Sequence, residues 1–331
     1  MNWQRLYAWA KEVSKHFPRL SRPQGFNLAL FSYGVIEARD CQLVKIAERL
    51  WWVGRADSVE RRLQRLLGNA HLELAWLQPA WMRWVLHRQM SDTITVLVDE
   101  TKLGDHLNVM MVGLAYRKRC IPLAWVSYPA TSKGQVERVR LLLERLASVW
   151  DGAVQVQADR GIGTSPDLIR VVEGLGWVYL FRVQNSVHLR QADGTDCPLG
   201  ELIQVGQHWY GQGWVFKDDG WRLLARVLLL WVPRYNQAWC LLTNDPQAQA
   251  TDYGRRNWQE QSFRDLKRGG WRWNSSQVWQ PTHADRLILL LALAYGWMVA
   301  LGTDCLVSGV QQRLARGRRC RYSVFRLGLR L

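Results

Sequence analysis

The order of strand and helix patterns between residues 93 and 183 constrains the fold of this chain more than any other feature. β-branched and apolar runs separated by turn residues predict strands, and apolar residues at helical spacing predict helices. The second predicted helix opens at Ser165-Pro166, with Ser165 as the N-cap and Pro166 at the first helical position. The predicted elements are strands at 93–101, 107–117 and 121–128, a helix at 135–150, a strand at 153–158, a helix at 165–174 and a strand at 177–183.

This order is that of an RNase H-like domain, an α/β fold built on a mixed five-stranded sheet with helices. In such a domain the first three strands form an antiparallel meander, and a helical crossover brings the fourth strand alongside the first. Asp99 stands at the polar end of the first predicted strand, and Asp159 directly follows the fourth. We therefore expect these two carboxylates on neighbouring central strands, projecting near one edge of the sheet.

A polar stripe is predicted on a later helix, over residues 253–267. The segment has no proline and no run of β-branched residues, so it is predicted to be helical. At roughly 100° per residue, four of its side chains fall within about 60° of one another on the helical wheel. They are Tyr253, Arg256, Glu260 and Lys267. A solvated face is the simpler interpretation of any one of them, but the mixture indicates a metal-binding carboxylate flanked by phosphate-binding cations.

The spacing of these four residues resembles the Tyr-(2)-Arg-(3)-Glu-(6)-Lys signature of insertion-sequence-4-type DDE transposases. The resemblance covers roughly residues 90–303. It implies an RNase H-like catalytic core that a β-rich insertion interrupts between the second aspartate and the glutamate. It also implies cut-and-paste DNA transposition, in which metal-dependent strand cleavage and strand transfer proceed through a hairpin intermediate. The stretch after Asp159 departs from the Asp-Arg-x-x-Asp form of some members and has Asp167 instead.

The partners that this resemblance implies are nucleic acids and a second copy of the chain. They are double-stranded DNA with terminal inverted repeats, target DNA and a homodimer partner in the synaptic complex. Two alternatives stay open: a catalytically inactive, transposase-derived DNA-binding protein, and a stand-alone RNase H-like nuclease. The complete acidic trio argues against the first, and the predicted DNA-binding helices and the insertion argue against the second.

Asp99, Asp159 and Glu260 are the predicted catalytic residues and metal ligands. Cleavage of a phosphodiester needs an activated nucleophile and charge stabilisation on the leaving oxygen, and two divalent ions about 3.5–4 Å apart supply both. Mg²⁺ selects carboxylate oxygens and keeps several waters, so three acidic residues suffice. Two Mg²⁺ ions are therefore the expected cofactor, with Mn²⁺ as a substitute.

Basic side chains near this trio are predicted to hold DNA phosphates. Arg256 is expected to bind phosphate bidentately, and Lys267 is expected to act as a point charge. Tyr253 is expected to donate a hydrogen bond to phosphate. Arg160 follows Asp159 in the sequence and either assists or pairs with a carboxylate.

The first 90 residues are predicted to form a helical, basic DNA-binding domain. One helix is predicted within 41–52 and another from Asp57, where Glu60 three positions on resembles a capping box. Three arginines of the second helix lie off its apolar stripe: Arg61, Arg62 and Arg65. Two short helices around a turn, the second rich in arginine, predict a helix-turn-helix DNA reader. The alternative is a helical bundle with an exposed basic face.

Residues 186–245 have the alternation and turns of a β-rich insertion, with five tryptophans. The family resemblance implies that one of these rings stacks on a flipped base. Trp214 and Trp239 are the candidates, and the others are predicted to be core residues. The predicted domains are 1–90 (helical DNA-binding), 91–185 (core, first part), 186–245 (insertion), 246–304 (core, second part with the catalytic helix) and 305–331 (basic tail).

The chain carries 44 lysines and arginines against 28 acidic residues, a formal net charge of +16, which predicts a polyanionic partner. Seven arginines of the tail are expected to contact phosphate: Arg313, Arg316, Arg318, Arg319, Arg321, Arg326 and Arg330. The six cysteines are scattered without zinc spacing. The apolar run at 287–301 is shorter than the roughly 18–20 residues of a membrane span. We therefore expect a cytoplasmic, nucleoid-associated prokaryotic protein without a membrane segment.

Overall fold

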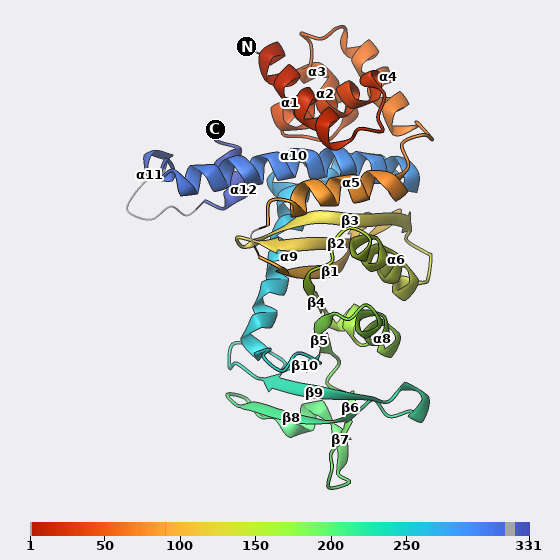
Figure 1. Cartoon of the computed structure of the whole chain (residues 1–331), viewed down its shortest axis with the longest axis vertical. Coiled ribbons are helices and arrows are strands. Elements are labelled where there is room, and N and C mark those ends of the chain that lie inside the picture. Colours follow the sequence, from red (N-terminus) through yellow and green to blue (C-terminus); the bar gives the residue numbers. More distant parts are fainter. Residues whose placement is uncertain (1, 90, 315–321) are drawn as a thin grey trace.

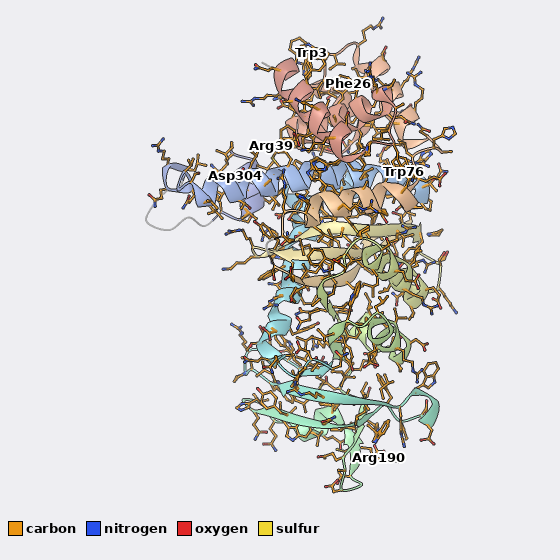
Figure 2. The ribbon with its side chains drawn as sticks, in the orientation of Figure 1. Trp3, Phe26, Arg39, Trp76, Arg190 and Asp304 are labelled. Carbon is orange, nitrogen blue, oxygen red and sulfur yellow. The ribbon has the colours of Figure 1, made fainter. Side chains whose placement is uncertain are left out.

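The computed structural model describes residues 2–89, 91–314 and 322–331. The chain has a mixed α/β fold, in which N-terminal helices cover one end of a long sheet (Figure 1). Figure 2 places Trp3 and Phe26 among these helices and Arg190 at the opposite end of the molecule. The helices that precede the sheet are α1 (Asn2–His16), α2 (Arg22–Ala38), α3 (Leu43–Arg49), α4 (Ala56–Leu67) and α5 (Leu74–Leu86).

The first half of the sheet follows the predicted order of elements. In sheet order its strands are β3, β2, β1, β4 and β5, with β1, β2 and β3 antiparallel and β1, β4 and β5 parallel. Its elements are β1 (Thr93–Leu103), β2 (Leu107–Tyr116), β3 (Arg119–Pro129), α6 (Gln135–Ala147), β4 (Ala153–Ala158), α7 (Arg160–Gly163), α8 (Pro166–Gly174) and β5 (Val178–Val183). The Ser165 hydroxyl accepts from the Leu168 amide at 3.4 Å, which confirms the predicted N-cap of α8.

The predicted insertion extends this sheet instead of standing apart from it. Strand β10 pairs antiparallel with β5 and with β9, so a single sheet of ten strands runs through the described residues. The added elements are β6 (His188–Arg190), β7 (Asp196–Pro198), the 3₁₀ turn η1 (Leu199–Leu202), β8 (His208–Val215), the 3₁₀ turn η2 (Asp219–Trp221), β9 (Leu223–Leu230) and β10 (Trp239–Thr243).

Strand β10 explains why the predicted five-stranded sheet is only half of the observed one. Cys240 and Leu242 enter the main core, while Leu241 packs into a second cluster on the other face. A strand that is apolar on both faces is stable only between two neighbours in a covered sheet. β10 therefore fills the edge that β5 would otherwise expose.

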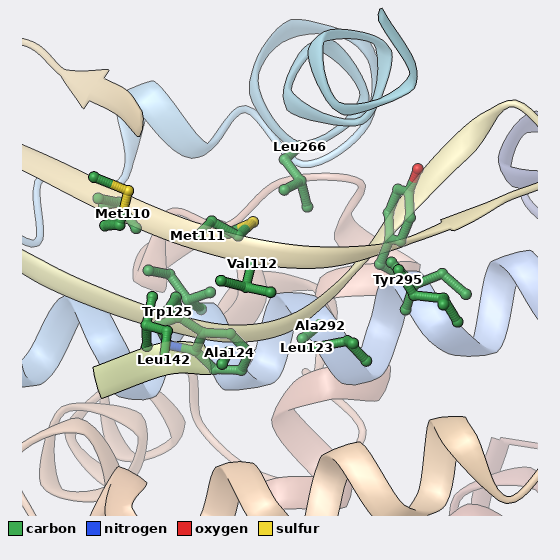
Figure 3. Packing of buried hydrophobic residues seen from close by; sticks show 14 of the residues in the cluster. Met110, Met111, Val112, Leu123, Ala124, Trp125, Leu142, Leu266, Ala292 and Tyr295 are labelled. Atoms are coloured by element: carbon green, nitrogen blue, oxygen red, sulfur yellow. The ribbon is translucent and has the colours of Figure 1, made fainter. Parts of the chain in front are cut away.

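Helix α10 (Pro281–Val307) links the N-terminal helices to the sheet and packs against both α2 and β3. In the described part of the chain it is the one helix long and apolar enough to cross a membrane, and 67% of its most apolar window is buried. Figure 3 shows Ala292 of α10 near Leu123 of β3. The Trp125 indole donates to the Asp285 carbonyl at 3.0 Å, which fixes the helix on the strand. α10 is therefore buried as a core helix. It extends beyond the apolar run at 287–301 in both directions.

The end of the predicted basic tail packs against α10. Helix α12 (Val324–Gly328) buries Phe325 against Tyr295, with ring centroids 4.8 Å apart. Gly302 of α10 allows this approach, because a Cβ there would lie 1.7 Å from the Val324 carbonyl oxygen. The short helix α11 (Gln311–Leu314) precedes it. The predicted tail arginines Arg316, Arg318, Arg319 and Arg321 lie outside the described residues.

The predicted capping box of the second N-terminal helix is wrong. Helix α4 begins at Ala56 with Arg55 at the N-cap, and no side chain caps it. Glu60 instead accepts from Gln64 one turn later at 3.1 Å. Helices α3 and α4 do pack together across the short turn that the sequence predicts.

Candidate active site

Asp99 lies within strand β1 and not at its end, which corrects the prediction. β1 continues to Leu103 because it keeps pairing with β2. β4, by contrast, stops at Ala158, whose partner on β1 is Val98. Asp99 is therefore the first β1 residue beyond the end of β4, with only 7% of its surface exposed. Its Oδ1 accepts from the Glu100 amide at 2.9 Å, which leaves Oδ2 for another partner.

Asp159 follows β4 directly and caps the short helix α7. Its Oδ1 accepts from the amides of Gly161 at 3.0 Å and Ile162 at 3.2 Å, so Oδ2 stays available. The Gly-x-Gly here serves packing, because a Cβ at Gly163 would lie 2.6 Å from the Arg182 carbonyl oxygen. The local turn and the end of β4 thus place the second carboxylate beside the first.

The segment predicted as one helix over 253–267 consists of three helical types. They are the 3₁₀ segment η3 (Ala250–Arg256), helix α9 (Asn257–Arg264) and the π-helix η4 (Asp265–Gly269). The rotation per residue changes at each junction, so the four residues of the predicted stripe no longer share one line. The structure buries Tyr253 and Arg256 and exposes Glu260.

A polar face of β4 that the sequence analysis missed holds η3 on the sheet. Residues two apart on a strand point to the same face, so Gln155, Gln157 and Asp159 share one face. The fully buried Gln157 amide donates to the Asp252 carbonyl at 3.2 Å and to Gln155 at 2.9 Å. Two glutamines in an otherwise apolar strand were the available signal. They position the segment that carries Arg256.

The three predicted carboxylates converge on Arg256. Its Nη2 lies 3.0 Å from Oδ2 of Asp99 and 3.3 Å from Oδ2 of Asp159, and its Nη1 lies 3.0 Å from Oε1 of Glu260. The structure thus brings together Asp99, Asp159, Glu260 and Arg256, as predicted. Arg256, however, is predicted to bind phosphate, and here it is a buried counter-ion of the carboxylates.

The electrostatics of this cluster follow from its burial. Burial raises the pKa of Asp99 to about 7, with Arg256 opposing the shift and the Asp159 charge adding to it. Burial lowers the pKa of Arg256, but the surrounding carboxylates outweigh it, so the net shift is upward and the guanidinium stays charged. Three carboxylates and one guanidinium formally leave two negative charges uncompensated.

The carboxylate oxygens of this cluster suit a hard divalent cation in their chemistry. Carboxylate oxygens are the ligands that Mg²⁺ and Mn²⁺ prefer. Asp99 and Asp159 each direct one oxygen at the same nitrogen of Arg256, so a positive charge already stands where they meet. With Arg256 in this position, no group of three or more His, Cys, Asp or Glu within the described ranges is arranged as a metal site.

Lys267, the last residue of the predicted stripe, is tied to strand β1. Its ammonium donates to Thr101 Oγ1 and to the Lys102 carbonyl, both at 2.7 Å. Burial lowers its pKa, and the Asp99 charge opposes this. Lys267 therefore braces the far end of β1, and two of its three N–H groups are already used.

A groove of about 1000 Å³ opens beside Asp159 and Glu260. Its opposite wall is the loop between β9 and β10, which supplies Arg234 and Tyr235. Arg160 donates to Gln237 of this loop at 2.6 Å, so within the described ranges it pairs with an amide and not with a carboxylate. Arg182 also lines the groove, and no sequence pattern distinguishes it, Arg234 or Tyr235 from ordinary surface residues. The groove is therefore lined by both acidic and basic side chains, with Asp159 and Glu260 among four arginines: Arg160, Arg182, Arg234 and Arg256.

The two candidate tryptophans fall in different places. Trp239 lines the groove, where its ring stacks on Tyr235 and meets the buried Tyr253 edge-on, at centroid distances of 5.5 and 5.2 Å. Burial raises the pKa of the Tyr253 phenol. Trp214 is 50% exposed on β8 and does not line the groove. Trp239 alone of the two lies near the carboxylates.

The three arginines of α4 differ in their environment. Arg61 and Arg65 are exposed on the helix surface. Arg62 is partly buried, donates to Asn27 at 2.6 Å and lies over the Phe26 ring. Arg62 therefore joins α4 to α2, and only the other two are free for an outside partner.

Comparison with known proteins gives a structural similarity and no similarity in sequence. The sequence matches no protein-family model and no curated protein. The chain is similar to one in a cryo-EM structure of a piggyBac transposase synaptic complex with hairpin DNA. The similarity has a TM-score of 0.41 and 12% sequence identity, and it covers 92% of this chain and 75% of that chain. A score this low does not establish a shared fold.

Proposed function

We propose that this protein is a DDE transposase of the insertion-sequence-4 type, which cuts and joins DNA strands with divalent metal ions. The observation that carries the proposal is the convergence of Asp99, Asp159 and Glu260 on one positive charge. Three carboxylates from a central strand, the neighbouring strand end and a later helix meet at Arg256, and two of them, Asp159 and Glu260, line the same groove as Arg182 and Arg234. Such an arrangement is costly without a cationic ligand or partner.

The order of strands supports an RNase H-like core. An antiparallel meander, with β4 and β5 added in parallel to β1, matches the topology expected of that domain. The glutamate arrives on a helix after a long β-rich stretch, as the family resemblance implies. On this proposal the strands beyond β5 form the insertion, although they continue the same sheet.

In the proposed mechanism, Asp99, Asp159 and Glu260 hold two Mg²⁺ ions, which Mn²⁺ can replace. When bound, the ions supply an activated nucleophile and stabilise the leaving oxygen of the phosphodiester. The residues of the chain fix the carboxylates in place and position the DNA backbone. Asp159 is held rigidly through its Oδ1, and the basic wall with Arg234 and Arg182 attracts the DNA backbone into the groove.

The proposed substrate is double-stranded DNA with terminal inverted repeats, and the proposed products are joined to target DNA by a homodimer. Exposed Arg61 and Arg65 on α4 would contact phosphates away from the cut. A hairpin intermediate exposes an unpaired base, and Trp239 is the candidate to stack on it because it lies in the groove. We place this activity in the prokaryotic nucleoid.

The test is cleavage of a plasmid that carries the gene with its native flanks. Purified protein is incubated with Mg²⁺ or Mn²⁺ beside Glu260→Gln, and broken ends are mapped. The matched control is Asp219→Asn, which neutralises a carboxylate that is 91% exposed far from the site. Paired breaks at inverted repeats, absent only in Glu260→Gln, are expected. Breaks without preference for repeats would indicate a nuclease, and binding without breaks would indicate a DNA-binding derivative.

A further inference from the structure

The guanidinium of Arg256 occupies the point at which a metal ion would bind on the proposed function. Only 8% of Arg256 is exposed, and its Nε has no hydrogen-bond partner. Its fixed position therefore depends on the two terminal nitrogens, which contact all three carboxylates. An unpartnered buried donor makes this position less stable than one in which all donors are satisfied.

One guanidinium does not balance the three carboxylates. With all three carboxylates ionised, Arg256 leaves two formal negative charges in the cluster, and Lys267, which donates to β1, adds a positive charge that acts on Asp99. A divalent ion that replaced Arg256 would bring one more positive charge than the guanidinium that it displaces. Electrostatic attraction to such an ion is strongest at the buried Asp99 and weaker at Asp159 and Glu260, whose side chains are 37% and 52% exposed.

An ion and Arg256 cannot share these oxygens. Oδ2 of Asp99 and Oδ2 of Asp159 both lie within 3.3 Å of one nitrogen, so a metal ligated by both would stand where that nitrogen is. Arg256 also lines the groove, so its side chain has open space beside it.

We propose that Arg256 is a displaceable counter-cation: it holds the three carboxylates together while no divalent ion is bound and leaves when an ion binds. This inference rests on the proposed function, since it needs the carboxylates to be a metal site. Arg256 is in this sense a positioning residue, which acts through the carboxylates. Once displaced into the groove, its fork is free to bind a phosphate oxygen pair.

The test measures Mn²⁺ binding to the DNA-free protein, with free Mn²⁺ followed by electron paramagnetic resonance. Arg256→Gln removes the competitor, so we expect Mn²⁺ to bind about tenfold more tightly than to the unaltered chain. The matched control is Arg255→Gln, which removes the same charge from the neighbouring residue. The Arg255 side chain contacts Thr95 and Asp252 and none of the three carboxylates of the cluster in the described structure. That control should keep the affinity of the unaltered chain.

The outcomes separate this inference from the proposed function. Equal affinity in Arg256→Gln and the unaltered chain would overturn the inference alone, and weaker binding in Arg256→Gln would do the same. Absence of Mn²⁺ binding in every variant would overturn the metal site itself. Arg256→Lys is a control for misfolding, because it keeps the positive charge and loses only the two-nitrogen guanidinium group. Its Mn²⁺ affinity should fall between that of the unaltered chain and that of Arg256→Gln. A greater rise of melting temperature with Mn²⁺ in Arg256→Gln is the supporting second readout.

Discussion

Arg256 Nη2 stands 3.0 Å from Asp99 Oδ2, and both side chains are about nine-tenths buried. This pair joins the 3₁₀ segment η3 to the centre of the sheet. A buried charge without its partner is costly, so each residue depends on the other.

Loss of Arg256 should destabilise the protein. Arg256→Ala leaves the buried Asp99 without its counter-ion, and we expect it to lower the free energy of unfolding by about 2–4 kcal/mol. Asp99→Asn added to Arg256→Ala should restore part of the loss, because the orphaned charge is then gone. Urea unfolding measures both, with Arg255→Ala as a control whose cost is about 1 kcal/mol or less. Equal losses in Arg256→Ala and Arg255→Ala would show that the pair does not contribute.

Neutral replacements of the carboxylates should stop cleavage and preserve DNA binding. We expect Asp99→Asn, Asp159→Asn and Glu260→Gln each to slow strand cleavage by about 1,000-fold or more, because the divalent ions lose a ligand. DNA affinity should stay within about twofold, since these changes remove repulsion of phosphate and no contact. Gel-based cleavage and binding assays on the same DNA end measure the two effects. Full cleavage by any of the three variants would remove that residue from the site.

Much of the core could be predicted because its signals are local. The apolar runs that form β1 to β5 each bury a strand, and the order of strands and crossovers then limits the sheet topology. That topology alone brings Asp99 beside Asp159. Their roles as metal ligands stay predictions.

The parts that could not be predicted depend on contacts between distant segments. The pairing of β10 with β5 is decided by an apolar strand that needs cover on both faces, which a local pattern does not reveal. The 253–267 segment divides into three helical types, and its first part, η3, is anchored to the sheet by Gln157, a residue much earlier in the chain. An ideal helical wheel assumes uniform rotation, so it places Lys267 beside Glu260, whereas Lys267 lies on the far end of β1.

Asp285 should make the stability of the protein depend on pH. Burial raises the pKa of the Asp285 carboxyl to about 7, well above its usual range, against a hydrogen bond that the Ser127 amide donates to it. The folded state thus holds a proton that the unfolded state releases, so this group's contribution to stability is lost as pH rises from about 4 to about 7. Asp285→Asn keeps a side-chain oxygen that can accept the hydrogen bond from the Ser127 amide, and it removes the pH-dependent loss of stability.

The measurement for Asp285 is urea unfolding of the original chain and Asp285→Asn at several pH values. The stability of Asp285→Asn relative to the original chain should rise between about pH 4 and 7 and level off above. The comparison cancels the other titrating groups, which both chains share. Parallel curves across this range would show that Asp285 titrates normally.

Trp239 and Trp214 should differ in their effect on hairpin formation. Trp239 lines the groove beside the carboxylates, whereas Trp214 lies on β8 away from it. Stacking on a base is worth about 1–3 kcal/mol, so Trp239→Ala should reduce hairpin yield at the DNA end by about fivefold or more. Trp214→Ala should leave it near the original level. The ratio of hairpin to nicked product on a labelled DNA end measures this, and equal effects would remove the groove aromatics from the mechanism.

The arginines of α4 should separate DNA binding from folding. Arg61→Gln and Arg65→Gln remove exposed charges, so each should weaken DNA binding and reduce the slope of log affinity against log salt by about one. Arg62 is tied to Asn27 and to the Phe26 ring, so Arg62→Gln should instead lower stability, by about 1 kcal/mol, with little change in the salt slope. Fluorescence anisotropy across a salt series and urea unfolding of the same three variants distinguish the two outcomes. If Arg62→Gln alone changes the salt slope, α4 meets DNA through the face that the structure packs against α2, and the N-terminal helices must rearrange on binding.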